Sequence, residues 1–343
     1  ANFSWTNQDN LSPINSALCH LVNVDPDFRN CSSLTSDALT NVPEGNNIWH
    51  VKIRDEAGNE SVVSEYSWTT DYTAPGATIV DKPPPYTNQT TVSFTYSSDN
   101  GTATFECQLL PVESDFSSCP SQGKTYSGLN EGNYTFKVRA RDPAGNVGAP
   151  DAYDFTVDTT PPVVQIDSRN PPGDFINQTT VTIAFSGNDN LSPFKFQCQL
   201  LGRDADFRDC TSDDVLTNLT EGTWTWRLRG VDEADNQSAP IEETWTVDTT
   251  PPTVSITSAE PAEGSYSSNP QPTFTFQASE LSTFSCTIDS GSPEDCGSTF
   301  SDSGSYTPSS PLADGPHTFV VVATDRAGNS SDPNDPNARR HWT

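Results

Sequence analysis

The chain has 343 residues, and its 17 Lys and Arg face 46 Asp and Glu, which gives a net charge of −29. So acidic a composition argues against nucleic acid and anionic membranes as partners, because both are bound mainly through contacts from Lys and Arg to phosphate. Apolar residues make up 32%, and no apolar run reaches the length of about 18 residues that a membrane span needs. We therefore expect no insertion into a membrane.

The organisation of the chain follows from a repeat. The pattern Asp-x-Ala-Gly-Asn occurs four times, with Asp in place of Gly in the third copy, and the copies begin 87, 90 and 93 residues apart. Eleven residues before each copy stands Glu-Gly or Asp-Gly, and the second and third copies are followed by the linker Val-Asp-Thr-Thr-Pro-Pro. The sequence therefore predicts four tandem domains, named here repeats 1 to 4, at 1–72, 73–160, 161–250 and 251–343.

Repeat 1 aligns with repeat 3 through the stretch Asn-Leu-Ser-Pro, which occurs at 10–13 and again at 190–193. On this alignment the chain begins within the second strand of a domain, so we expect repeat 1 to lack its first strand. Two explanations remain. We favour an excerpt of a longer array, because the C-terminus offers no spare strand and the chain begins with Ala without a basic leader. The alternative is that a neighbouring chain donates the missing strand.

Within each repeat the hydrophobic pattern has a period of two, which is typical of strands with one buried and one solvated face. The alternation is found at 134–141, 92–96, 181–185, 224–228 and 319–323. About seven short strands in some ninety residues, separated by turn signals, predict an all-β fold. We expect a tandem array of four Ig-like antiparallel β-sandwich domains, with the inward aromatic residues in the core rather than serving as platforms for sugars.

The repeated Asp-x-Ala-Gly-Asn stretch predicts a tight turn, because Gly adopts the positive φ that such a turn needs and Asp and Asn bond to turn backbone groups. Asp235, which replaces the Gly in repeat 3, is also acceptable there. The alternative interpretation is a calcium site at the end of a domain, built with the linker residue Asp158 or Asp248. We favour the turn, and we expect no cofactor and no metal.

The eight cysteines fall two to a repeat, at separations of 12, 12, 12 and 10 residues. Close Cys-x-x-Cys pairs, which zinc sites prefer, do not occur. The simplest connectivity is one disulfide inside each repeat, and such bridges persist in an oxidising, extracellular compartment. The expected pairs are Cys19 with Cys31, Cys107 with Cys119, Cys198 with Cys210, and Cys286 with Cys296.

N-glycosylation sequons agree with an extracellular location, although the abundance of Asn, Ser and Thr explains about half of them. Sequons occur at Asn2, Asn10, Asn30, Asn59, Asn88, Asn100, Asn133, Asn177, Asn190, Asn218, Asn236 and Asn329. Asn88 and Asn177 occupy matching strand starts and are the first candidates. The further candidates for a covalent glycan are Asn133, Asn218, Asn10 and Asn190.

The combined pattern resembles the Ig-like repeats of very large bacterial surface proteins. It consists of the cysteine pair at 107 and 119, Tyr-Ser-Gly-Leu at 126–129, Glu-Gly at 131–132, the turn at 142–146 and the linker at 157–162. Similar repeats occur in secreted proteins of green algae, including those that build flagellar hairs. The resemblance covers the whole chain and implies a location at the cell surface. It does not distinguish between three functions of such repeats, as stalks, adhesin arms or filament subunits.

An enzyme is not expected, and we name no catalytic residue. The four histidines stand in unrelated settings, and His50 occupies a position that other repeats fill with Lys137, Arg227 or Val320, typical of a solvent-facing strand residue. We favour a structural role as a rod, stalk or surface filament, with an adhesin arm that binds glycans or a surface protein as the alternative. The expected partners are further copies of the protein or neighbouring repeats of the same long chain.

Overall fold

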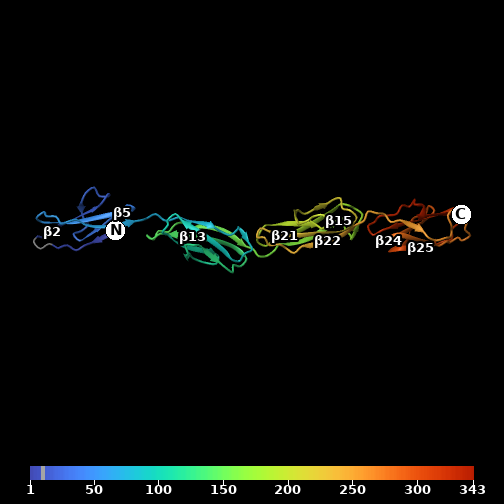
Figure 1. The fold of residues 1–343 in the computed structure, drawn as a ribbon, viewed down its shortest axis with the longest axis horizontal. Coiled ribbons are helices and arrows are strands. Elements are labelled where there is room, and N and C mark those ends of the chain that lie inside the picture. Colours follow the sequence, from blue (N-terminus) through green and yellow to red (C-terminus); the bar gives the residue numbers. More distant parts are fainter. Residues whose placement is uncertain (9–11) are drawn as a thin grey trace. The chain divides into compact units, whose positions relative to one another are not determined.

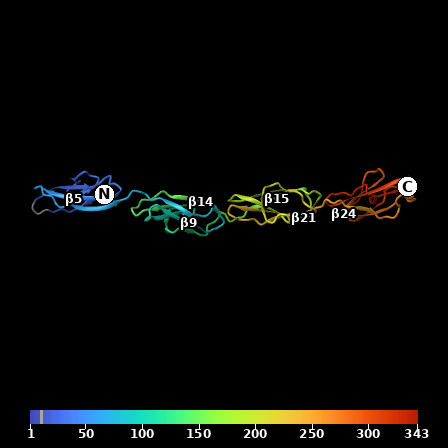
Figure 2. The same ribbon diagram turned by 45° about the horizontal axis from the view of Figure 1, so that its top comes forward.

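The computed structural model describes residues 1–8 and 12–343. It divides into two compact units, Ala1–Asp158 and Thr159–Thr343. Figures 1 and 2 show that strands make up both units. None of the described residues form a helix with the length and apolar character that a membrane crossing requires. The chain is thus all-β, and it consists of about four Ig-like sandwich domains in tandem.

Repeat 1 pairs its strands in two sheets, ordered β1-β4 and β3-β2-β5-β6. Repeats 2 and 3 place a third strand in the smaller sheet, and the described residues of repeat 1 contain no counterpart of it. The strands are β1 (Asn2–Ser4), β2 (Ile14–Leu21), β3 (Arg29–Asn30), β4 (Ser36–Ala38), β5 (Gly45–Asp55) and β6 (Ser64–Thr70).

Repeat 2 has a three-stranded sheet, β12-β9-β7, and a five-stranded sheet, β11-β10-β13-β14-β8. Most of the pairings are antiparallel, while the short β8 pairs with β14 in parallel. The strands are β7 (Ala77–Asp81), β8 (Tyr86–Thr87), β9 (Val92–Ser98), β10 (Thr104–Leu110), β11 (Ser117–Cys119), β12 (Lys124–Tyr126), β13 (Gly132–Arg141) and β14 (Asp151–Val157).

Repeat 3 has the same topology, with sheets ordered β15-β17-β20 and β16-β22-β21-β18-β19. In Figure 2, β15 and β21 belong to the two sheets of this sandwich. The strands are β15 (Val163–Asn170), β16 (Phe175–Ile176), β17 (Val181–Asn188), β18 (Phe194–Leu200), β19 (Arg208–Cys210), β20 (Asp214–Leu216), β21 (Gly222–Asp232) and β22 (Ile241–Val247).

Repeat 4 departs from this topology because its strands run on where the other repeats turn. Repeats 2 and 3 separate two strands by turns rich in Asp, Asn and Gly, whereas repeat 4 has Ala-Ser-Glu-Leu-Ser at 278–282 and continues as one long strand with register shifts. A short 3-10 turn, Pro336–Ala338, precedes the last strand. The strands are β23 (Val254–Ile256), β24 (Phe274–Ile288), β25 (Glu294–Tyr306), β26 (His317–Thr324) and β27 (Arg339–Trp342).

The apolar side of each alternating strand faces a core, as the period of two predicts. Along β13, Tyr134, Phe136 and Val138 are buried, while the intervening side chains reach solvent. Phe136, Trp226 and Phe319 are 0% exposed, so these aromatic residues are core residues. Four separate cores result, one in each repeat. The boundaries of the repeats, at residues 73, 161 and 251, remain a prediction.

Separate cores predict local effects of core mutations. Phe136→Ala is expected to destabilise repeat 2 by about 3–5 kcal/mol, because it removes a fully buried ring, and to leave hydrogen exchange in repeat 4 unchanged. Val112→Ala, at a position that is 58% exposed, is the control. Hydrogen–deuterium exchange read by mass spectrometry on the whole chain measures both. Faster exchange spread equally over all four repeats would contradict independent cores.

Candidate functional site

The eight cysteines form four disulfides, each within one repeat, with Cα–Cα distances of 5.1, 5.8, 5.9 and 5.8 Å. Three bridges join neighbouring strands of one sheet, β10 to β11, β18 to β19 and β24 to β25, and the bridge of repeat 1 joins β2 to the residue that follows β3. In repeats 1 to 3 the second strand of the pair is the short edge strand of the larger sheet. The disulfide therefore anchors an edge strand of two or three residues, which has few backbone hydrogen bonds of its own.

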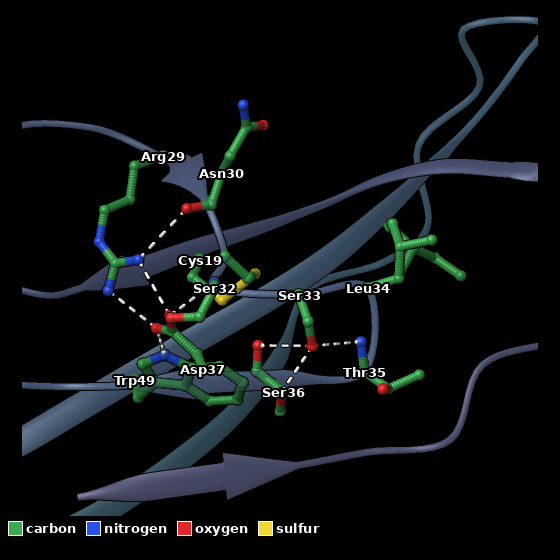
Figure 3. Close-up of a disulfide and its surroundings, with 12 residues drawn as sticks. Cys19, Arg29, Asn30, Ser32, Ser33, Leu34, Thr35, Ser36, Asp37 and Trp49 are labelled. Carbon is green, nitrogen blue, oxygen red and sulfur yellow. Dashed lines mark hydrogen bonds and ion pairs between the residues drawn. A yellow bond between two sulfur atoms is a disulfide. The ribbon is translucent and has the colours of Figure 1, made fainter.

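Beside the first disulfide lies a buried ion pair, which Figure 3 shows with Cys19 behind it. Asp37 is 2% exposed and accepts two hydrogen bonds from the Arg29 guanidinium, at 3.1 and 2.8 Å. Ser32 adds bonds from its backbone N–H and its hydroxyl, and the Trp49 ring nitrogen approaches to 3.4 Å. Repeat 3 contains the same arrangement, in which Asp214 accepts bonds from Arg208 and from the Trp226 ring nitrogen.

Burial by itself raises the pKa of Asp37, but the bonds from Arg29 and Ser32 outweigh it and the net pKa is lowered below its ordinary value of 3.8. A carboxyl whose folded pKa is lowered stabilises the fold above its unfolded pKa. That contribution is lost as the pH falls through the folded pKa. The ion pair therefore makes the stability of repeat 1 depend on pH. Its stabilising effect is fully present at neutral pH and decreases in acid.

We predict that Asp37→Asn lowers the stability of repeat 1 at pH 7 by about 1–3 kcal/mol, because a buried charged hydrogen bond is lost while Arg29 still reaches solvent. The difference between variant and wild type should shrink as the pH falls below about 4. Denaturation curves from pH 7 to pH 2 measure it, with the exposed Asp27→Asn as the control. A difference that stays constant over this range would show that the ionised form of Asp37 is not what stabilises the repeat.

The repeated Asp-x-Ala-Gly-Asn stretches form tight turns, as expected. In the first, the Asp55 carboxylate accepts bonds from the backbone and side-chain nitrogens of Asn59, at 2.8 and 2.9 Å. The bonds from Asn59 and Ser12 lower the pKa of Asp55 to about 2. The fourth residue has positive φ in every copy, at Gly58, Gly145, Asp235 and Gly328. Asp235 thus adopts the conformation that Gly adopts elsewhere.

The turn also contacts the linker that precedes its own repeat, which the sequence analysis did not predict. In the first unit, Asn146 donates from Nδ2 to the carbonyl oxygen of Asp71 at 3.0 Å. In the second unit, Asn329 donates in the same way to Asp248 at 2.8 Å. The Asp of each turn holds the same Asn nitrogen at 2.8 Å. One amide therefore joins a turn of one repeat to the end of the repeat before it.

The Glu of the Glu-Gly turn also contacts the linker, namely the one that follows its own repeat. Glu44 accepts a bond from the Thr73 hydroxyl, and Glu221 accepts bonds from the hydroxyls of Thr249 and Thr250. The Glu of one repeat and the turn Asn of the next repeat therefore contact the same linker. Glu, Thr and Asn recur at matching positions of the repeats, and this recurrence could have indicated the contact from the sequence.

We predict that Asn146→Ala weakens the junction between repeats 1 and 2 more than the matched variant Asn59→Ala affects its own turn. Asn59 makes the same bonds to Asp55, but within the described residues it faces no linker carbonyl. The extra cost should be about 0.5–1.5 kcal/mol, the net contribution of one hydrogen bond. Equilibrium denaturation of both variants measures it. Equal costs would mean that the contact with Asp71 contributes nothing.

An acidic cluster lies at the junction of repeats 3 and 4. Asp248 of the linker, Asp325 of the turn and Glu280 place carboxylate oxygens within 4.8 Å of one another. Burial raises the pKa of Glu280, and so do the negative charges of Asp248, Asp325 and Glu221. Carboxylates suit calcium, but three fill less than the six to eight positions that calcium takes. Asp248 and Asp325 belong to the sequence-based calcium alternative, whereas Glu280 was missed by it.

The structure separates the sequons into two groups. In three copies of the turn motif the Asn is followed after one residue by Ser, and both side chains are used by the fold. Asn59 and Asn329 donate their side-chain nitrogens as described, and Asn236 donates to Asp232 at 2.7 Å. The Ser hydroxyls accept from strand N–H groups: Ser61 from Ile53, Ser238 from Gly230 and Ser331 from Ala323.

The described candidates for a glycan lie outside the turn motif. Asn133, Asn177, Asn190 and Asn218 are exposed and Asn88 is half-buried, while the candidate Asn10 lies outside the described residues. Asn133 uses its oxygen to accept a bond from Thr156 at 2.8 Å. Glycosylation modifies the side-chain nitrogen, which this bond does not use.

We predict that expression in a host with N-glycosylation gives glycan at Asn133 and Asn177, and none at Asn329. The side-chain nitrogen of Asn329 donates to both Asp325 and the Asp248 carbonyl, so a sugar on it would remove one of these bonds. Glycopeptide mapping measures the occupancy of each position. Substantial occupancy at Asn329 would show that the turn forms after modification or not at all.

Comparison with known proteins supports the fold. Residues 88–159 and 254–336 each match the bacterial Ig-like domain. No curated protein matches the chain. Among solved structures, the chain is 17% identical to the tetra-tandem repeat in the extending region of a large adhesion protein, with 93% of this chain and 90% of that chain covered and a TM-score of 0.33.

Two further solved structures match the chain at lower identity. The fibronectin(III)-like modules of CbhA from Clostridium thermocellum are 14% identical, over 50% of this chain and 94% of that one, with a TM-score of 0.32. The FN1-FN3 domains of chicken CNTN1 are 12% identical, over 78% of this chain and 97% of that one, with a TM-score of 0.31.

Proposed function

We propose that the chain is an extracellular spacer, a segment of a rod, stalk or surface filament in which serial disulfide-linked Ig-like domains supply reach. The observation that carries this proposal is the repeated hydrogen bond from a turn Asn to the preceding linker, Asn146 to Asp71 and Asn329 to Asp248. A spacer requires limited motion between neighbouring domains. Here the Asp-x-Ala-Gly-Asn turn that recurs in every repeat also binds the linker between two domains.

Further observations support an extracellular, non-catalytic role. Four disulfides in a chain without free cysteine in its described part suit an oxidising compartment. Bacterial Ig-like domains are typically surface-exposed and non-catalytic, and a repeated module supplies length rather than one pocket. The net charge of −29 on the chain opposes close packing of free chains, so side-by-side assembly would need a bridging cation or glycan.

Small-angle X-ray scattering of the whole chain tests the proposal. Strands of eight to ten residues at about 3.4 Å each give domains of about 30–40 Å, so four in series predict a particle about 120–160 Å long. The double variant Asn146→Ala with Asn329→Ala should have a shorter mean length and a broader distribution. Asn59→Ala, the matched control, should behave like the wild type. A compact wild-type particle, or a double variant of unchanged length, would contradict the spacer.

The alternative function, an adhesin arm, is favoured by one observation in repeat 2. A groove of about 570 Å³ combines the half-buried Tyr86 and the exposed Pro111 with the polar Asn133 and Asp154. An aromatic ring beside polar groups is an arrangement that binds sugars. A panel of immobilised oligosaccharides tests it: specific binding that is lost in Tyr86→Ala supports the adhesin, and no binding by the wild type rules the groove out as a glycan site.

A further inference from the structure

The histidines correct one expectation from the sequence, that all four stand in unrelated settings. In repeat 1, His20 of β2 lies directly opposite His50 of β5, and His50 lies opposite Glu65 of β6. The three side chains form one row across three adjacent strands. They lie on the outward face of the sheet, whereas Cys19 and Trp49 on either side point into the core.

The two imidazoles are close enough to share a metal ion. Their ring centroids are 5.9 Å apart. Two imidazoles bound to one ion through nitrogens at about 2.0–2.1 Å have centroids about 5–6 Å apart. Side chains directly opposite on antiparallel strands start from Cβ atoms about 4.5–5.5 Å apart, so small rotations of the two rings suffice.

The hydrogen bonds of the rings fix which nitrogen is available. His20 Nε2 lies 3.1 Å from the carbonyl oxygen of Asp25, and His50 Nε2 lies 2.9 Å from Glu65 Oε2. Both oxygens only accept, so each neutral ring carries its proton on Nε2 and its lone pair on Nδ1. Metal-binding histidines are oriented in this way, since the second nitrogen donates to a carbonyl or carboxylate.

The surroundings allow an ion to approach. Phe28 packs against both imidazole rings and limits their motion. Its ring centroid lies 5.3 Å from that of His20 and 6.4 Å from that of His50. Lys52 lies 4.4 Å above the Phe28 ring, but its ammonium is paired with Glu60 at 2.7 Å. The His50 side chain is 24% exposed, so solvent reaches the row.

We propose that His20 and His50 form a binding site for one borderline divalent cation, Cu²⁺, Ni²⁺ or Zn²⁺, on the outer face of repeat 1. The two Nδ1 atoms are the protein ligands, water completes the coordination, and Glu65 and the Asp25 carbonyl are positioning groups. Imidazole is a ligand that these metals prefer. The site belongs to repeat 1 alone among the aligned positions, because repeat 2 pairs Gln108 with Lys137 and repeat 3 pairs Gln199 with Arg227.

The sister repeats supply the variants for the test. His20→Gln and His50→Lys introduce side chains that the same fold carries at these positions in repeat 2. His317→Gln is the control, since both ring nitrogens of His317 are already bonded, to Asp289 and to the carbonyl of Ala313. CuCl2 is titrated into the whole chain with excess CaCl2 present, so that carboxylate clusters are occupied by calcium.

Electron paramagnetic resonance should show hyperfine coupling of the first bound Cu²⁺ to two nitrogens in the wild type and in His317→Gln. Each of His20→Gln and His50→Lys should reduce the coupling to one nitrogen and weaken binding by tenfold or more in calorimetry. Glu65→Gln should keep both nitrogens and weaken binding about tenfold, as loss of an orienting group does. Oxygen-only coordination, or an unchanged affinity in His20→Gln, would overturn the proposal.

Discussion

The proposed spacer depends on one hydrogen bond, which in each of the two units runs from the turn Asn of a repeat to the backbone carbonyl of the linker before it. The amide of Asn146 makes this bond only because Asp142 holds it in place at 2.8 Å and Gly145 allows the turn with a φ of 98°. Each of the two units contains this bond once, at Asn146 and at Asn329. Glu44 and Glu221 accept bonds from hydroxyls of the same linkers.

Different parts of each repeat make different contributions. Small cores leave each domain with a limited hydrophobic contribution, and the disulfide stabilises the edge of the sheet, beside an Arg–Asp pair in repeats 1 and 3. The turn contacts the linker. The outer faces of the sheets carry different side chains in different repeats. The cross-strand pair His20 and His50, found where repeat 2 has Gln108 and Lys137, is such a difference.

Much of the fold follows from local sequence patterns, whereas the junctions do not. The alternation at 134–141 places Phe136 in the core, and the turn motif requires positive φ at its fourth residue, because both are properties of a few neighbouring residues. The bond from Asn146 to Asp71 joins residues 75 apart, and Glu280 belongs to no repeated motif. Likewise, the facing of His20 and His50 depends on the register of two strands, which the spacing of two histidines in the sequence does not reveal.

The most direct test of the account is the distribution of distances across the junction of repeats 1 and 2. Spin labels carried by noncanonical residues at the exposed positions Thr40 and Ser121 leave the native disulfides intact, and double electron–electron resonance reads the distance between them. The account predicts one narrow distribution in the wild type that broadens in Asn146→Ala and stays narrow in Asn59→Ala. A broad distribution in the wild type, or a narrow one in Asn146→Ala, would contradict the claim that this hydrogen bond restrains the joint.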